Sequence, residues 1–482
     1  MDTSTMSFQG GQVLMGGSPL KLLRLSEPAL RVVRKWSSGQ PVGTGRGAQR
    51  LARRLLSVGT HLPVPASGGL RTHDVTVVIP VRDRPEQLKT LLSALDGMAC
   101  VVVDDASEDQ ARTEAIAQQF GARFIGMKVN RGPSHARNAG LEVATTKLVA
   151  FVDSDCVPTN DWLNPILALF DDPLVGAVAP RIAPAESAPP TKLSRYEQVR
   201  SSLDRGSTPG LVRPQSRISY VPSAALVVRR EASALPFFDP ELRGGEDVDL
   251  VWRLTDAGWD VRYAPESVVH HHGPQTLSEW MTRRAFYGTT AGPLSMRHPG
   301  RLVPLHTSAW TAGVWGLLAA RRPVAAGATL AASVFVLAHR LRDLVDQPVK
   351  VATRVAGGGT AKSLLPGLGG LTRAWSPAFA LGLCFRRTRR QAAVALLLPA
   401  VGDWWQGDRD LDPVSYSALH VADDLSYGAG VWVGCLRERT LEPLLPRITW
   451  RSRVWSAASL KTQLDGTRPG HQGQRPDIES PG

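Results

Sequence analysis

Charged side chains directly follow two β-branched runs, in VIPVRDR at 78–84 and VVVDDASED at 101–109. A carboxylate at the end of a strand can accept a hydrogen bond from a nucleobase N–H, and we predict that Asp105 does so. The same position would also suit an aspartate that only caps the next helix, so the interpretation depends on the accompanying motifs. We further assign three residues at the end of the first run to the same nucleotide-binding site: Pro80, Val81 and Arg82.

Two carboxylates two positions apart follow another apolar run, in FVDSDC at 151–156. Hard oxygen ligands of this kind suit Mg²⁺ or Mn²⁺, which can bridge the phosphates of a nucleotide. D-x-D pairs also occur elsewhere in the chain, but only this pair directly follows a VAFV strand. We therefore predict that Asp155 binds the metal and that Asp153 contacts the nucleotide ribose or belongs to the metal shell.

A Gly-Pro turn opens a helix in NRGPSHARNAG at 130–140. Backbone amides at a helix start and an arginine side chain can both receive phosphate or nucleotide oxygens. A capped helix with a solvated arginine is the alternative. Because the segment lies between the two acidic motifs, we predict that Gly132, Arg137 and Asn138 contact the nucleotide sugar.

Two adjacent acids begin another predicted helix, in LRGGEDVDLVWRL at 242–254. An acid at a helix start often only stabilises the helix dipole. Transfer of a sugar, however, needs a base that takes the proton from an acceptor hydroxyl, and a carboxylate can do this. We predict Asp247 as that base and Glu246 as its catalytic partner, while the sequence leaves the choice among Glu246, Asp247 and Asp249 open.

A histidine triplet at 270–272 ends a further predicted strand. Alternation along a strand sends neighbouring side chains to opposite faces, so at most two of the three point the same way. A single surface histidine usually has no chemical role. Near an acidic rim, however, the triplet suggests a metal or phosphate contact, and we predict His271 as a metal ligand.

Repeated β-α units would position these motifs. Apolar runs alternate with amphipathic stretches, and we expect strands at 75–80, 100–104, 123–127, 148–153 and 175–182. Short apolar strands between helices predict an α/β fold with a mostly parallel, doubly wound sheet. Such sheets bind ligands at the carboxyl ends of their strands, which would gather the acidic motifs at one rim.

The connections carry less information. Ser107 and Gln110 suggest a capping box for a helix that runs to Phe120. The pattern predicts a helix over 134–144 and another strand over 224–228. The Pro-, Ser- and Arg-rich segment 183–222 is expected to be a connecting loop.

Composition limits the classes of partner. A chain of 482 residues is long enough for two or three folding units. The net charge is +13, and residues 1–73 hold ten Lys or Arg against only Asp2 and Glu27. Because Arg clusters beyond residue 320 border apolar runs, we favour a membrane surface over nucleic acid as the anionic partner. Four widely spaced cysteines argue against a zinc knuckle or a disulfide framework, and we expect no secretory signal.

Taken together and in order, these motifs resemble the inverting family-2 glycosyltransferases, which have a GT-A fold. The resemblance implies that Asp105 contacts the donor base, that Asp153 and Asp155 hold ribose and metal, and that Asp247 is the base. It also implies a nucleotide-sugar donor and a divalent metal, Mg²⁺ or Mn²⁺. His271 matches a histidine found in relatives about two dozen residues after the acidic pair.

Within that family the chain is similar to the glycosyltransferases of the mycofactocin system, which makes a peptide-derived redox cofactor. Residues 12–66 resemble a small PqqD-like winged helix that binds peptides. Leu22, Leu23 and Leu25 would form its apolar edge, and an Arg-rich helix would offer a cationic face. A basic structural cap is the alternative. The resemblance implies UDP-glucose as donor and a small peptide-derived acceptor that carries an oligosaccharide.

We accordingly expect a peptide-binding module at 1–70, a GT-A domain at 74–295, a helical region at 300–460 and a disordered tail at 461–482. Apolar segments at 302–320 and 323–338, separated by Arg321 and Arg322, predict a helical hairpin. It would lie in or cross the cytoplasmic leaflet, or form a soluble helical subdomain. We therefore expect the protein at the cytoplasmic face of the cell membrane or in the cytoplasm.

Three other functions fit parts of the pattern. A family-2 enzyme acting on cell-envelope glycan or lipid would share every motif. A sugar nucleotidyltransferase would also use acidic metal ligands, but the chain lacks an early Gly-rich phosphate loop with Arg and Lys. A catalytically inactive scaffold would not need the intact acidic residues.

Overall fold

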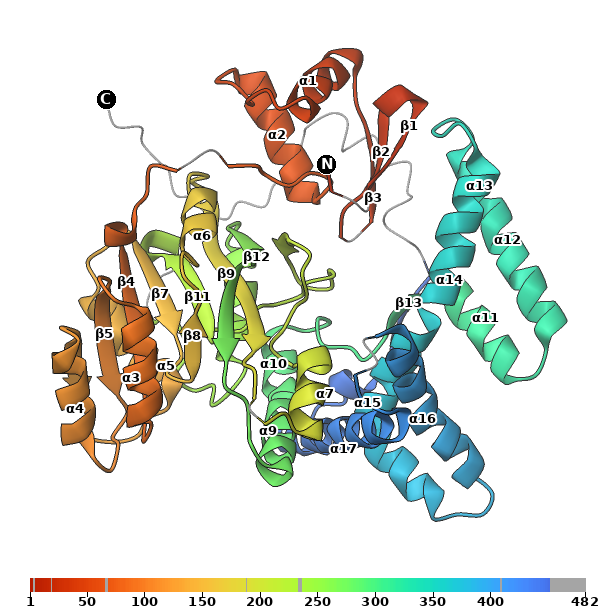
Figure 1. Cartoon of the computed structure of the whole chain (residues 1–482). Helices are drawn as coiled ribbons and strands as arrows, with labels where there is room; N and C mark the ends of the chain where they lie inside the picture. Colours follow the sequence, from red (N-terminus) through yellow and green to blue (C-terminus); the bar gives the residue numbers. More distant parts are fainter. Residues whose placement is uncertain are drawn as a thin grey trace.

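The computed structural model describes residues 1–2, 5–18, 20–65, 68–187, 189–232, 236–407 and 410–450. A small N-terminal module, a central α/β unit and a C-terminal group of helices follow one another along the chain (Figure 1). The tail expected at 461–482 lies outside the described residues.

The central unit is built on a nine-stranded sheet. Its main strands are β4 (Val75–Val81), β5 (Ala99–Asp104), β6 (Arg123–Gly126), β7 (Leu148–Val152), β9 (Val175–Pro184), β11 (Ala225–Arg229) and β12 (Asp260–His271). The order is β10-β12-β9-β11-β7-β4-β5-β6, with β8 (Cys156–Pro158) paired to β12. Strands β6, β5, β4 and β7 are parallel, whereas β11 runs antiparallel between β7 and β9. All the strands expected from the apolar runs form.

Helices cover both faces of this sheet, as expected for a doubly wound fold. Helices α3 (Pro85–Ala94), α4 (Gln110–Gln119) and α6 (Asn164–Leu169) pack on one face through side chains such as Leu88, Ile116 and Ile166. Helices α5 (Pro133–Val143) and α8 (Glu246–Asp256) pack on the other face through Leu141 and Leu250. Burial on both faces explains why these strands are continuously apolar.

Two local expectations were wrong. Asp109, not Ser107, caps α4, because its carboxylate accepts the N–H of Arg112 at 3.0 Å. The segment 183–222 is not a plain loop, since it contains α7 (Lys192–Arg200) and the edge strand β10 (Gly210–Val212).

The N-terminal module has a three-stranded antiparallel sheet and two helices. Its elements are β1 (Met6–Phe8), β2 (Val13–Gly16), β3 (Lys21–Arg24), α1 (Glu27–Ser37) and α2 (Arg46–Val58). One sheet face packs on these helices, through Leu14 and Leu23 against Leu30 and Leu55. The other face packs on the C-terminal helices. The module therefore has two buried sheet faces.

This burial contradicts the expected apolar edge. Leu22, Leu23 and Leu25 are all buried, and Leu22 packs with Leu341 and Val345 of the C-terminal region. The Arg-rich helix α2 also contacts the central unit, where Arg53 forms ion pairs with Asp172 and Asp260. The module thus contacts both the central unit and the C-terminal helices α12 (Pro323–Leu341) and α13 (Pro348–Ala352) (Figure 1).

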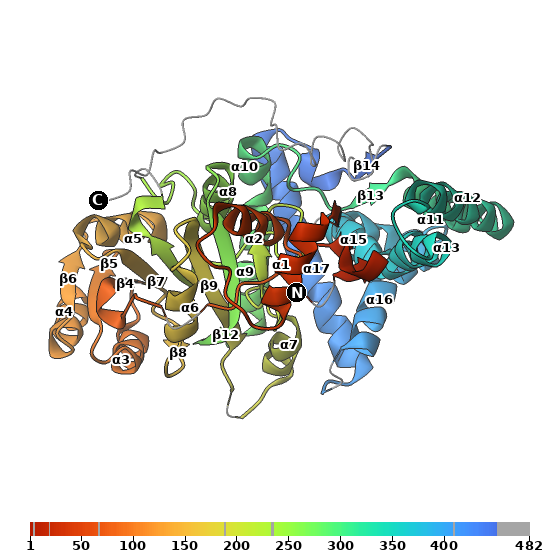
Figure 2. The ribbon, with the colours of Figure 1, turned by 90° about the horizontal axis from the view of Figure 1, so that it is seen from above.

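The C-terminal region is helical, as expected. It comprises α9 (Leu277–Thr289), α10 (Ala291–Arg297), α11 (Ala309–Ala319), α12 (Pro323–Leu341), α13 (Pro348–Ala352), α14 (Gly358–Lys362), α15 (Leu364–Leu383), α16 (Arg389–Gln406) and α17 (Pro413–Glu438), with the strand pair β13 (His306–Ser308) and β14 (Arg447–Thr449). Helices α11 and α12 form the expected hairpin. Seen from above, α17 lies beside α9, between the sheet and that hairpin (Figure 2).

Candidate active site

A cavity of about 1190 Å³ opens at the carboxyl ends of β4, β5 and β7. The structure brings almost all the predicted site residues to its wall: Pro80, Val81, Arg82, Asp105, Gly132, Arg137, Asp153, Asp155, Glu246, Asp247 and His271. These residues come from six separate segments of the chain. The structure therefore gathers the residues predicted at strand ends and helix starts around one cavity.

Asp105 contacts the turn that precedes α5. Its two oxygens accept the backbone N–H groups of Arg131 at 2.8 Å and Gly132 at 2.7 Å. Gly132 has φ +89°, a conformation that favours glycine at this close approach. The neighbouring Asp104 instead holds the loop before α4, by accepting the N–H of Ser107 at 2.8 Å. Asp105 is thus not a simple cap of the next helix, and it links two walls of the cavity.

Arg137 joins the two acidic motifs. Its guanidinium donates to Asp153 at 2.6 Å and to Glu246 at 2.9 Å, and only 3% of the residue is exposed. Burial opposes the charge, but the two carboxylates hold the pKa of Arg137 above its usual value. Burial also raises the pKa of Asp153, while Arg137 opposes that shift. In this structure Arg137 fixes the end of β7 relative to the start of α8.

Asn138 is the one predicted site residue that does not line the cavity. Its side-chain amide donates to the Phe238 carbonyl at 2.7 Å and accepts the Phe238 N–H at 2.9 Å. This double contact holds the segment before α8 against α5. An α-helix turns by about 100° per residue, so Arg137 points towards the cavity while Asn138 points towards Phe238.

Asp155 lies between an arginine and a histidine side chain. It forms an ion pair with Arg84, and its Oδ2 lies 3.7 Å from Nε2 of His271. Burial disfavours the charged carboxyl, yet His271 and Arg84 together hold the pKa of Asp155 well below its usual range. Arg84 was not predicted, although it stands in the same VIPVRDR motif as Arg82.

The donors present fit a divalent cation that shares its shell with a ligand. Among the residues that the structure describes, no group of three or more His, Cys, Asp or Glu side chains forms a closed metal site. Mg²⁺ is typically held by one or two carboxylates together with substrate phosphates. Asp155 and His271 on the cavity wall could act as two protein ligands, and the ion pair to Arg84 would then have to open.

The three acids in the first turn of α8 have different surroundings. Glu246 accepts from Arg137, and Asp249 accepts from His298 at 2.9 Å and from Arg253 at 2.7 Å away from the cavity. Asp247 has no cation within ion-pair distance among the described residues. Its oxygens accept the N–H groups of Ser223 at 3.2 Å and Val248 at 2.8 Å.

Asp247 is also poised to titrate near neutrality. Burial and the charge of Glu246 raise the pKa of Asp247 to about 6, against the two backbone hydrogen bonds. A general base works best when its pKa is close to the working pH. Of the three acids, Asp247 therefore has the environment that best suits a base.

The far side of the cavity was not predicted from the sequence. It is formed by the segment 201–223 and by α9, α15 and α17, with side chains that include Tyr220, Tyr287 and Tyr427. Scattered tyrosines carry no spacing signal, so only the fold reveals that they meet.

The chain is similar in sequence to known glycosyltransferases. The model of glycosyl transferase family 2 matches residues 76–233. The chain is 37% identical to the pre-mycofactocin glycosyltransferase of Mycobacterium tuberculosis over 451 residues, which cover 91% of this chain and 95% of the relative. It is 26% identical over 211 residues to glycosyltransferase AglE of Haloferax volcanii, covering 41% and 66% of the two chains. The predicted GT-A type fold is confirmed.

Among solved structures, a mannosyltransferase from Pyrobaculum calidifontis in complex with GDP-Man and Mn²⁺ matches 78% of this chain and 98% of its own. The identity is 18% and the TM-score is 0.39.

Proposed function

This chain belongs to the pre-mycofactocin glycosyltransferases of glycosyl transferase family 2, and from that membership we propose the reaction in detail. The protein transfers a hexose, glucose, from UDP-glucose to pre-mycofactocin, a small peptide-derived acceptor, and builds its oligosaccharide. The transfer inverts the anomeric configuration. The observation that carries the proposal is a cavity with Asp153 and Asp155 on one wall and Asp247 on another. Among the described residues, no cationic side chain forms an ion pair with Asp247.

The proposed chemical step is a single displacement. The acceptor hydroxyl oxygen bonds to the anomeric carbon while the bond from that carbon to the diphosphate oxygen breaks. The hydroxyl proton passes to the carboxylate of Asp247, and nucleoside diphosphate leaves. Glu246, held by Arg137, keeps a negative charge beside Asp247 and so favours proton uptake there.

Asp155 and His271 would hold Mg²⁺ or Mn²⁺, with Asp153 as ribose contact or further ligand. A divalent cation bound there would neutralise the charge of the leaving diphosphate. Asp105, Gly132 and the 80–82 segment would bind the nucleotide. Family membership makes the sugar nucleotidyltransferase alternative less favourable, whereas an acceptor in cell-envelope glycan or lipid remains the competing substrate.

The first test is transfer itself. Purified protein with Mn²⁺, UDP-glucose and pre-mycofactocin should give an acceptor that is heavier by one or more hexose units, measured by mass spectrometry.

The same assay can test the N-terminal module, because its residues Arg46 and Arg50 are exposed on α2 and can be replaced. If the module binds the acceptor, Arg46→Gln/Arg50→Gln should raise the acceptor KM and leave hydrolysis of UDP-glucose unchanged.

Two results would contradict these proposals. Release of UDP with no change in acceptor mass would remove pre-mycofactocin as the acceptor, while leaving a glycosyltransferase. An unchanged acceptor KM in the double variant would leave the module as a structural part of the fold, consistent with its two buried sheet faces.

Association with a membrane surface is a further part of the proposal. Among the described residues, α12 is the one helix long and apolar enough to cross a membrane, by length and composition only. Val324 and Phe335 on α12 are 87% and 73% exposed. From residue 280 to residue 402 the only acids are Asp343 and Asp346. Apolar side chains beside arginines favour the interface of an anionic bilayer.

We therefore expect the protein to sediment with vesicles that contain phosphatidylglycerol and not with pure phosphatidylcholine vesicles. Arg386 and Arg387 are exposed at the α15–α16 turn beside Phe385. Since each arginine near the surface contributes about 1 kcal/mol, Arg386→Gln/Arg387→Gln should weaken binding roughly 10- to 30-fold. Arg46→Gln/Arg50→Gln, with the same charge change on another face, should not. Equal losses in both variants would indicate unspecific charge attraction.

A further inference from the structure

The cavity is shared between the α/β unit and helices that lie outside the family-2 match at residues 76–233. Tyr287 of α9, Arg373 of α15 and Tyr427 of α17 all line it, opposite the strand ends that carry the acids. The donor-binding motifs account for only one side of this space. The other side is built from residues to which the proposed chemistry gives no role.

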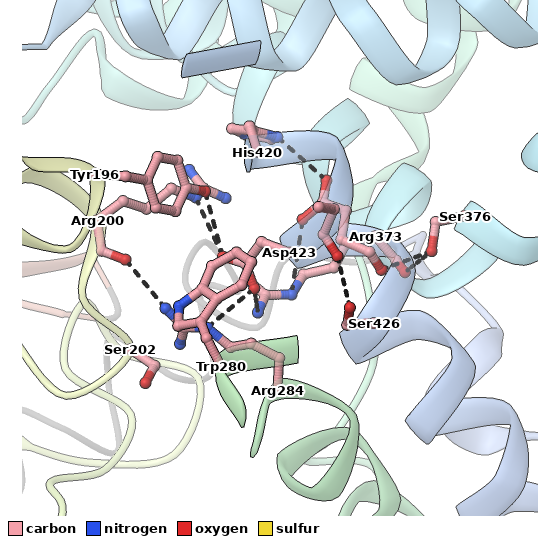
Figure 3. Close-up of polar contacts among 12 residues, drawn as sticks. Tyr196, Arg200, Ser202, Trp280, Arg284, Arg373, Ser376, His420, Asp423 and Ser426 are labelled. Carbon is pink, nitrogen blue, oxygen red and sulfur yellow. Dashed lines mark hydrogen bonds and ion pairs between the residues drawn. The ribbon is translucent and has the colours of Figure 1, made fainter. Parts of the chain in front are cut away.

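Three arginines from three different elements converge on one buried carboxylate (Figure 3). Arg200, Arg284 and Arg373 lie 3.9, 3.3 and 3.4 Å from the oxygens of Asp423, which is 1% exposed. All four residues line the cavity. The cluster joins α7, α9, α15 and α17 at the floor of the far side.

Some N–H groups of these arginines can still donate a hydrogen bond. Arg200 and Arg284 also donate through their terminal nitrogens to Asp403 and Glu197. The separations from Asp423 nevertheless exceed the usual 2.7–3.2 Å of an N–H···O hydrogen bond, and the buried Nε of each arginine has no hydrogen-bond partner among the described residues. A buried guanidinium N–H without a partner is costly. An oxygen acceptor of a ligand in the cavity would provide one, because small side-chain rotations could turn these donors toward it.

Two arginines that line the cavity stack on tyrosine rings. The guanidinium of Arg205 lies 4.2 Å from the ring centre of Tyr220, and that of Arg373 lies 4.1 Å from the ring centre of Tyr427. Arg205 lines the cavity and forms no ion pair with a carboxylate among the described residues. Its buried Nε also lacks a partner. Stacked guanidinium and phenol faces suit a ring, and their N–H groups suit oxygen acceptors.

Glycines fix this wall relative to the α/β unit. A side chain at Gly430 of α17 would place its Cβ 1.9 Å from the Ala285 carbonyl oxygen of α9, and one at Gly288 would meet the Tyr427 carbonyl oxygen at 2.1 Å. The two helix backbones are therefore in direct contact. Close backbone packing of this kind gives Tyr427 and Tyr287 a defined spacing on the far side of the cavity.

We infer that this far side is the acceptor subsite, and that it selects a ring-bearing small molecule with carbonyl or carboxylate oxygens. The ring stacks on Tyr220 and Arg205, and the oxygens accept from Arg205 and from the arginines that Asp423 positions. The inference rests on the proposed transfer reaction and gives it an acceptor class. It also makes the C-terminal helices part of the active site rather than a separate anchor.

The test uses Arg205→Gln and Tyr220→Leu in the full-length protein. The probe is pre-mycofactocin, titrated by calorimetry into protein saturated with UDP and Mn²⁺, and then used in turnover assays. Loss of a charge-assisted hydrogen bond should weaken acceptor binding and raise the acceptor KM about 10- to 100-fold. The affinity for UDP-glucose and its slow hydrolysis should stay at wild-type values.

Arg217→Gln is the matched control, because Arg217 lies in the same segment but does not line the cavity. Wild-type acceptor affinity in folded Arg205→Gln and Tyr220→Leu would overturn the subsite, as would an equal loss in Arg217→Gln. Absence of transfer in the wild type, with acceptor binding still lost in the two variants, would instead overturn the proposed reaction and keep the subsite.

Discussion

Asp247→Asn should bind UDP-glucose as the wild type does and lose transfer by roughly 10²- to 10⁴-fold, the usual cost of removing a general base. The amide keeps the shape of the side chain and can still accept the Ser223 N–H at 3.2 Å. It cannot take the proton of the acceptor hydroxyl. Donor affinity by calorimetry and single-turnover transfer rates separate binding from chemistry.

The pH profile gives an independent readout. A base acts in its ionised form, and burial together with Glu246 raises the pKa of Asp247 to about 6. Wild-type kcat should therefore fall as the pH drops through about 6, and the residual rate of Asp247→Asn should lack this step. Asp256→Asn, on the same helix but paired with Arg301, is the control. Near-normal turnover in folded Asp247→Asn would move the base role to another group.

Product stereochemistry tests the same step without a variant. A single displacement from an α-linked donor gives a β-linked product, which the anomeric proton coupling in NMR reports. Retention of the α configuration would exclude the direct displacement even if Asp247 proved essential.

The strand-end acids could be predicted because the signal is local. An apolar run followed by Asp fixes both the strand and the edge at which its carboxylate emerges, as Asp105, Asp153 and Asp155 show. Glu246 and Asp247 could be predicted in the same way, because both stand at the start of a helix directly after Gly245, which has φ +75°.

Contacts between residues that are far apart in the sequence could not be predicted in this way. Nothing local distinguishes Arg137, which bridges two carboxylates, from Asn138, which holds Phe238 on the other side of the helix. The burial of Leu22 depends on helices more than 300 residues further along the chain. The far side of the cavity, with Tyr287 and Tyr427, likewise forms only because glycines let α17 approach α9.

The second large effect is expected at Asp155. In the wild type, Mn²⁺ or Mg²⁺ should strengthen binding of UDP-glucose, because the cation would neutralise diphosphate charge beside Asp155 and His271. Asp155→Ala removes the carboxylate and leaves Arg84 without its ion-pair partner. We expect the variant to lose the metal-dependent part of the affinity, on the order of 100-fold. Its metal-free affinity should not fall, since Arg84 is then able to contact phosphate directly.

Four calorimetric titrations test this, with wild type and Asp155→Ala each measured with Mn²⁺ and with EDTA. Only the difference between the two conditions reports the metal, so a general loss of fold would appear in both and be recognised. Asp96→Ala, which removes an exposed carboxylate remote from the cavity, should keep the full metal response. His271→Ala should lose part of it, because one ligand remains. If Asp155→Ala kept the full Mn²⁺ response, the cation would have to bind elsewhere. If the wild type bound UDP-glucose equally well with Mn²⁺ and with EDTA, donor binding would rely on Arg84 and its neighbours instead of a metal.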